Sequence, residues 1–144
     1  MERIDFYPVL SSEARAIELF ACRLAEKAHA QAHRIFIRTA DREQAQALNE
    51  LLWTFRQGSF VPHALADAAD PEDTVLIGNE LPEHADRDLL INLAPSLAPG
   101  WQQFRRLAEV FGQDPAALEE ARQRFRHYRS QGFNPETHKL EAEA

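Results

Sequence analysis

Short apolar runs that alternate with helical stretches constrain the fold of this chain more than any other feature. Four runs rich in β-branched or aromatic residues predict buried strands over residues 4–9, 34–38, 74–77 and 88–93. These runs are apolar along almost their whole length, which is typical of strands in a sheet that is covered on both faces. The chain is therefore expected to form a sheet with helices on each side.

Helical periodicity occupies two of the gaps between these runs. Apolar residues recur at helical spacing over residues 12–32, with Ser11 or Ser12 as the expected N-cap. A second helix is predicted to begin at Asp41, whose carboxylate can cap it, with Gln44 three residues further on. The order strand, helix, strand, helix, strand predicts a parallel α/β sheet with right-handed crossovers.

The C-terminal third contains one ambiguous stretch and one clear helix. Residues 101–111 fit either a helix or, near their end, a strand. A helix is predicted after Asp114, which can cap it, with Pro115 at the first helical position. Gly132 is expected to end this helix.

The length of 144 residues predicts a single core. We expect one α/β domain over residues 1–134 and a flexible tail over 135–144. No apolar run approaches the roughly 18 residues that a membrane span requires, and no secretion signal is recognisable, so a cytoplasmic protein without membrane contact is expected. The single cysteine, Cys22, is predicted to be a small core residue in a reducing compartment.

The charge is acidic overall but unevenly distributed. A formal net charge of −7 argues against direct DNA binding, which requires a basic surface. Residues 121–139 contain five basic residues and one acidic residue, a local charge of +4 that leaves −11 for the rest of the chain. This distribution favours a docking surface for an acidic partner.

Patterns that would indicate catalysis are weak. No glycine-rich phosphate-binding motif follows the first predicted strand, so no nucleotide cofactor is expected. His84, Asp86 and Asp88 alternate in a polar loop. His63 with Asp67 resembles a base and its orienting carboxylate. A small metal-dependent hydrolase that uses either group stays open as the alternative function, but neither a second ligand cluster nor a nucleophile accompanies them, and no metal is expected.

Aromatic side chains near the end of the second helix form the first informative group. Trp53 lies there, and Phe60, Val61 and Pro62 follow after a glycine turn. They form either an exposed apolar patch that anchors a partner or a segment that folds back over the edge of the sheet.

Arginines on the last helix form the second group. Arg122, Arg126 and Arg129 recur at helical spacing beside an apolar stripe. Guanidinium groups beside apolar rings suit a peptide that carries acidic residues and ends in a hydrophobic one. The alternative is a solvated face that is paired with neighbouring glutamates.

Several sequence blocks together resemble the chi subunit family of the bacterial DNA polymerase III holoenzyme. These blocks, which span nearly the whole chain, are Asp5-Phe6-Tyr7, Leu52-Trp53, Ser59-Phe60-Val61-Pro62-His63 with Leu65-Ala66, residues 88–93, and Arg124-Phe125-Arg126-His127-Tyr128-Arg129 with Gly132-Phe133-Asn134. The resemblance implies a three-layer α/β/α sandwich around a five-stranded, mostly parallel sheet whose last strand, residues 105–111, is antiparallel. It also implies a non-catalytic accessory subunit that links single-stranded DNA-binding protein (SSB) to the clamp loader through a second subunit, psi.

The binding sites of this family map onto the sequence by motif. The site for the acidic C-terminal tail of SSB maps onto Phe111, Arg122, Phe125, Arg126, Tyr128, Arg129 and Gly132. The contact with psi, or with a helicase at the same patch, maps onto Trp53, Phe60, Val61, Pro62 and His63. Arg122 and Arg126 are expected to engage carboxylates, while Phe111 and Phe125 flank the terminal phenylalanine of the tail. Phe125 replaces a usual tyrosine and Leu118 an occasional lysine, which predicts a less salt-sensitive site.

Overall fold

The computed structural model describes residues 1–68, 73–82 and 86–140. A single seven-stranded sheet has the order β3-β4-β2-β5-β6-β1-β7. Every strand pairing in it is parallel. Its elements are β1 (Arg3–Pro8), α1 (Ala14–Ala30), β2 (Ile35–Arg38), α2 (Arg42–Thr54), β3 (His63–Leu65), η1 (Ala66–Ala68), β4 (Val75–Gly78), β5 (Leu89–Asn92), η2 (Trp101–Gln103), β6 (Arg106–Phe111), α3 (Pro115–Ser130) and β7 (Glu136–Thr137).

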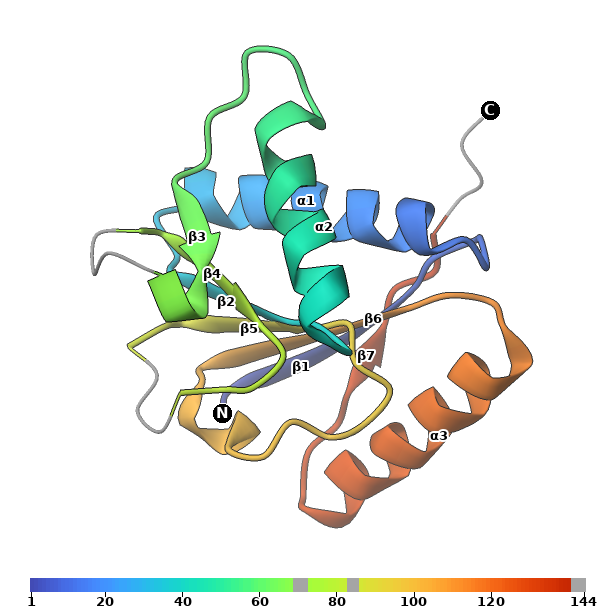
Figure 1. Cartoon of the computed structure of the whole chain (residues 1–144). Helices are drawn as coiled ribbons and strands as arrows, with labels where there is room; N and C mark the ends of the chain where they lie inside the picture. The colour runs from blue at the N-terminus through green and yellow to red at the C-terminus, as the bar shows by residue number, and fades with distance from the viewer. Residues whose placement is uncertain (69–72, 83–85, 141–144) are drawn as a thin grey trace.

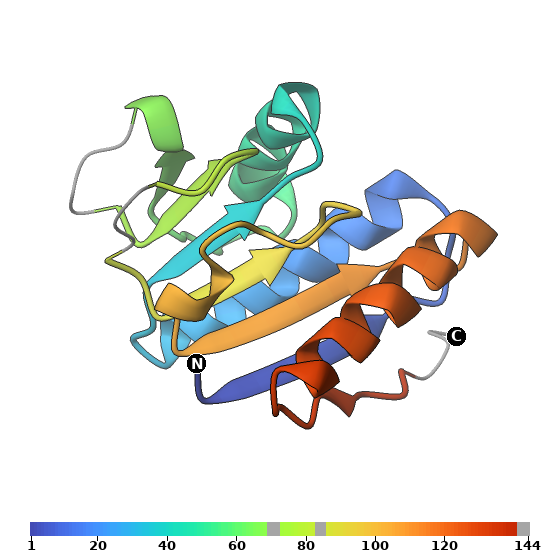
Figure 2. The same cartoon turned by 90° about the horizontal axis from the view of Figure 1, so that it is seen from below.

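Helices cover both faces of the sheet. In Figure 1, α1 and α2 lie above the sheet and α3 lies below it, and Figure 2 shows α3 running along β6 and β1. Ile35 and Ile37 of β2 belong to the core under α1 and α2, whereas Phe36 between them belongs to the core against α3. All three are fully buried, which confirms the expectation of a sheet enclosed on both sides.

Two features of the expected sheet are corrected. The sheet has seven strands rather than five, because β3 and β7 add three and two residues at its edges. Strands this short leave no periodic pattern in the sequence. The expectation that residues 105–111 run antiparallel was wrong, because β6 pairs in parallel with both β1 and β5. The connection through η2 is long enough to return the chain to the starting end of the sheet.

Residues 101–111 proved to be two elements. Trp101 begins a single 3-10 turn, and β6 follows after Phe104. The strand expected near the end of this stretch is therefore confirmed, and the only helical part is the short turn Trp101–Gln103.

Two of the three predicted helix N-caps are confirmed. The Asp41 carboxylate accepts a hydrogen bond from the Gln44 backbone N–H at 2.8 Å. Asp114 accepts one from Ala117 at 3.3 Å. The prediction of Ser11 or Ser12 as N-cap was wrong, because the cap of α1 is Glu13, with no side-chain capping bond.

A glycine allows two loops to meet at the carboxyl ends of β1 and β6. A Cβ atom at Gly112 would lie 2.6 Å from the Ser11 carbonyl oxygen and 2.7 Å from Ile17 Cδ1. Contacts this short exclude any side chain without movement of the backbone. Gly112 therefore lets the turn before α3 pack against the start of α1.

Three further observations bear on the expectations for the chain as a whole. Cys22 is fully buried, and burial raises the pKa of its thiol to about 12. β7 pairs with β1 within the expected tail, whose last residues, 141–144, lie outside the described part of the chain. No helix in the described residues combines the length and the apolar character that crossing a bilayer needs.

Candidate protein-binding surfaces

The buried side of α3 is polar at its centre. Arg124 is nearly enclosed, and its Nε donates to Glu109 Oε1 at 3.1 Å. The Tyr128 hydroxyl donates to the other oxygen of Glu109, and Asn92 Nδ2 donates to Oε1 at 2.9 Å. Glu109 itself is fully buried in β6. These bonds tie the helix to the middle of the sheet.

Burial and charge act against each other in this group. Burial raises the pKa of Glu109 above its usual value, while Arg124 acts to lower it. Burial and the neighbouring carboxylate together raise the pKa of the Tyr128 hydroxyl well above its usual range. The phenol is therefore a hydrogen-bond donor at every ordinary pH.

Sequence reasoning missed this buried group. Arg124 was counted within the basic stretch, but its charge faces Glu109 and not the solvent. Tyr128 is likewise inside, so its proposed role in binding a tail would act through the position of α3. A glutamate at position 109 within an apolar run was the one available signal, because an acidic residue in a buried strand requires a partner.

The exposed side of α3 carries the arginines. Arg122, Phe125 and Arg129 are spaced by three and four residues and share one side of the helix. Arg126 is one position beyond Phe125, about 100° further round the helix. All three arginines are exposed, and Phe125 is half-buried.

The rings of Phe111 and Phe125 both pack against the ring of Phe6. The Phe125 ring lies 5.2 Å from the ring of Phe6, and the Phe111 ring lies 6.0 Å from it, measured between centroids. Phe6 is buried in β1, whereas Phe111 and Phe125 are half-buried. The structure therefore brings Phe111 and Phe125 onto one apolar support, next to the arginines.

The arginines differ in their partners. Arg122 NH1 lies 3.5 Å from Glu119 Oε2, and both side chains are largely exposed. Arg126 and Arg129 form no ion pair with any residue in the described part of the chain. The alternative prediction was that neighbouring glutamates pair with these arginines. Within the described residues this is true of Arg122 and not of Arg126 or Arg129.

Gly132 ends α3 in the conformation that favours glycine. Its φ is +94°, and a Cβ there would meet no atom within 4 Å, so backbone conformation and not space is the constraint. The Gly132 N–H donates to the Arg129 carbonyl and the Phe133 N–H to the Tyr128 carbonyl, which forms a Schellman motif. The turn places the Phe133 ring 5.6 Å from Trp101.

The aromatic group at the other end of the sheet is partly exposed. Trp53 is 57 % and Phe60 is 68 % exposed, and their ring centroids are 6.0 Å apart. Val61 and His63 are buried, and Pro62 is half-buried. We call Trp53 and Phe60 the aromatic patch. Of the two alternatives predicted for this segment, folding back over the edge of the sheet describes Val61, which is buried. The exposed patch describes Trp53 and Phe60.

His63 has a structural place beneath the aromatic patch. Its Nδ1 lies 2.6 Å from the Val61 carbonyl oxygen and its Nε2 lies 2.9 Å from that of Asn49. Asp67, the carboxylate considered as its partner, instead pairs with Arg42 at 2.8 Å. The structure therefore does not form a histidine–aspartate pair at this site.

The other residues considered for a hydrolase are also engaged. Asp86 pairs with the Arg34 side chain at 3.0 Å, and Asp88 accepts from the Arg34 backbone N–H at 3.0 Å. His84 lies outside the described residues. Within the described residues these carboxylates stabilise the start of β2.

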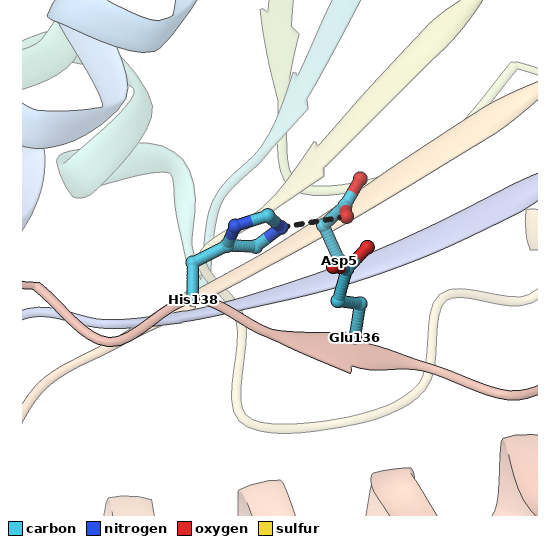
Figure 3. A group of neighbouring side chains, drawn as sticks. All are labelled: Asp5, Glu136 and His138. Atoms are coloured by element: carbon cyan, nitrogen blue, oxygen red, sulfur yellow. Dashed lines mark hydrogen bonds and ion pairs between the residues drawn. The ribbon is translucent and has the colours of Figure 1, made fainter.

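A group that sequence spacing did not reveal lies where β7 meets β1. Asp5, Glu136 and His138 place ligand atoms within 4.8 Å of one another (Figure 3). His138 Nε2 lies 2.8 Å from Asp5 Oδ1, and Arg3 bridges Asp5 at 2.9 Å and Glu136 at 3.1 Å. Arg106 lies 3.5 Å from Asp5.

These contacts decide the chemistry of the group. Burial alone would raise the pKa of Asp5, but hydrogen bonds from His138 and Arg3 lower it below its usual value. Carboxylate and imidazole are metal-ligand types. Two guanidinium groups already neutralise the carboxylates here, however, and a cation would have to displace them. The contacts of Asp5 with His138 and of Arg3 with Glu136 hold the C-terminal segment on β1.

Comparison with known proteins identifies relatives along most of the chain. A family described as "DNA polymerase III chi subunit, HolC" matches residues 1–136. DNA polymerase III subunit chi of Pseudomonas aeruginosa is 42 % identical over 143 residues, which cover 97 % of this chain and 98 % of the relative. The protein of the same name from Escherichia coli is 31 % identical over 85 % of this chain and 84 % of the relative. That from Haemophilus influenzae is 29 % identical over 92 % and 94 %.

Proposed function

The chain belongs to the DNA polymerase III chi subunit family, and we propose that it is a non-catalytic adaptor in DNA replication. In this proposal α3 receives the acidic C-terminal tail of SSB. The aromatic patch binds the psi subunit of the clamp loader, or a helicase at the same place. No cofactor takes part.

One observation carries the proposal for α3. Arg126 and Arg129 are exposed and lack an acidic partner within the described residues, and Phe125 on the same helix packs, like Phe111, against Phe6. Guanidinium groups bind carboxylates, and half-buried rings accept an apolar side chain. A peptide that combines carboxylates with a terminal phenylalanine complements both features.

The roles within this site are divided. Arg122, Arg126 and Arg129 attract and orient the carboxylates of the tail, while Phe111 and Phe125 flank its terminal ring. Tyr128 contributes by holding α3 on Glu109, and Gly132 by ending the helix with the turn that seats Phe133.

The placement of the two surfaces supports a bridging role. The aromatic patch lies beside β3, at one end of the sheet, and on the same side as α2. The helix α3 packs on the opposite face, over β6 and β1 near the other end (Figure 1). Two partners bound at these places would not compete for the same surface.

A peptide titration tests the α3 site. The full chain is titrated with an SSB-tail peptide and with the same peptide lacking its final phenylalanine. We expect the intact tail to bind and the shortened one to bind far more weakly, because the shortened one leaves the rings uncovered. Equal affinity for both peptides, or none for either, would contradict the proposal.

Matched variants locate the binding site. Arg126→Gln removes an exposed arginine of α3 that has no ion pair with a described residue, while Arg105→Gln removes an exposed arginine that pairs with Glu2 elsewhere. We expect weaker tail binding only for Arg126→Gln. A loss in the Arg105 variant of the same size would show attraction by overall charge rather than by α3.

A further inference from the structure

A groove of about 490 Å³ lies between α1 and the C-terminal segment, on the face of the sheet opposite α3. Apolar side chains of Leu24, Leu89 and Ala108 line it, from α1, β5 and β6 respectively. His138 and Leu140 of the C-terminal segment form another part of the lining. The hydrogen bond between Asp5 and His138, shown in Figure 3, holds the segment there.

The charge of the lining is opposite to the charge of the chain. Arg3, Lys27, Arg106 and Lys139 line the groove, and Asp5 is the single carboxylate among the described residues that line it. With the histidines neutral, the described lining residues carry +3, whereas the whole chain carries −7. Four cations are therefore concentrated on one hollow of an acidic molecule.

The carboxylate of Asp5 does not neutralise all four of these positive charges. Asp5 is buried, and its Oδ1 accepts from Arg3 and bonds with His138, while its Oδ2 lies 3.5 Å from Arg106 NH2. The Arg106 Nε is buried and has no hydrogen-bond partner among the described residues. Lys27 and Lys139 are exposed and form no ion pair with a described residue. The rim therefore has positive charge in excess.

We infer that this groove binds a small organic anion that has an apolar body and a carboxylate or phosphate group. The body would lie on Leu24, Leu89 and Ala108, and the anionic group would face Lys27, Arg106 and Lys139. The volume falls within the roughly 300 to 1,000 Å³ of small-molecule sites, which favours such a ligand over a protein partner. The inference does not rest on the proposed role of α3, which lies on the other face.

Four probes separate the contributions of charge and apolar surface. The ¹⁵N-labelled full chain is titrated at low salt with phenyl phosphate, benzoate, inorganic phosphate and benzyl alcohol, and amide shifts are followed by NMR. We expect saturable shifts at Leu24, Leu89 and Ala108 with phenyl phosphate, benzoate or both, and weaker responses to the other two probes. Binding by only one of the aromatic anions identifies the preferred anionic group.

Variants at exposed positions avoid the risk of unfolding. Lys27→Gln and Lys139→Gln are each expected to weaken binding of the aromatic anion about two- to five-fold, as for exposed ion pairs. Arg42→Gln, which removes an exposed arginine of α2 that pairs with Asp67, is the control and should leave binding unchanged. No saturable shift at the groove residues, an equal response to benzyl alcohol, or equal weakening by the control would overturn the inference.

Discussion

The two surfaces proposed for partners are built in opposite ways. On α3 the exposed side carries arginines and the buried side is polar, with Arg124 and Tyr128 bonded to Glu109. At the aromatic patch the exposed side carries Trp53 and Phe60, and the buried side of α2 is wholly apolar: Ala45, Leu48, Leu51 and Leu52.

The difference teaches how each surface depends on its surroundings. Attraction between exposed charges is screened over about 10 Å at 0.1 M salt, whereas apolar contact is not weakened by screening. The arginine surface also depends on a helix that a few directional bonds hold in place. The aromatic patch depends on close packing beneath α2. Salt, and the loss of single buried polar groups, should therefore separate the two surfaces.

The largest effect is expected for Glu109→Gln. The change leaves the buried guanidinium of Arg124 without its counter-charge, and breaking a buried ion pair costs about 3 to 5 kcal/mol of unfolding free energy. Denaturant unfolding measures this loss. Glu119→Gln, which removes the exposed partner of Arg122, is the control and should unfold like the wild type. A loss for Glu109→Gln no larger than for the control would contradict the importance given to the buried group.

Phe60→Ala should separate binding from stability. Phe60 is 68 % exposed, so its removal should leave the melting temperature unchanged. If it anchors psi or a helicase as proposed, binding of that partner should weaken by about 2 to 4 kcal/mol, as for an interface hot spot. A pull-down and a calorimetric titration measure this. Binding of the SSB tail should be unaffected, and a parallel loss there would mean that the two surfaces are not independent.

Tyr128→Phe distinguishes direct from indirect roles on α3. The variant removes one donor to the buried carboxylate of Glu109 and should cost about 1.5 to 3 kcal/mol of stability. The exposed arginines and Phe125 stay in place, so the folded variant should bind the SSB tail with wild-type affinity. A titration well below the melting temperature tests this. Lost affinity in a folded variant would place the hydroxyl in the binding site.

The smallest effects are expected for single exposed arginines. Arg126→Gln and Arg129→Gln should each weaken binding of the SSB tail by about 0.2 to 1 kcal/mol, because these side chains are exposed and solvent screens them. Raising the salt concentration should weaken tail binding and leave binding at the aromatic patch unchanged. Equal salt dependence at both surfaces would contradict the idea that charge governs binding at α3 and apolar contact governs binding at the aromatic patch.

Much of the fold could be predicted from short-range patterns. The cores of β1, β2, β4 and β5 fall within the predicted strands, and the caps at Asp41 and Asp114 form as expected. These features depend on alternation or on contacts within one helical turn. β7 could not be found in this way, because two residues at an edge are stabilised by pairing with β1 and not by their own pattern.

At the candidate surfaces, too, local spacing could be predicted from the sequence, whereas contacts between distant segments could not. The spacing of Arg122, Arg126 and Arg129 predicted that they share one face of a helix, and these residues do lie on one helix and are exposed. The spacing could not show that Arg124, in the same run, points to a carboxylate in β6. Nor could it place His138 on Asp5, 133 residues away along the chain.

The amino-acid sequence alone determined the alternation of strands and helices, two of the helix caps, and the concentration of basic residues near the C-terminus. Only the tertiary structure decided which of those basic residues face the solvent, and that Lys139 lines a groove together with Arg3, Lys27 and Arg106. The physical reason is that periodicity and capping are local, whereas burial and charge compensation arise between segments that meet only when the sheet has formed.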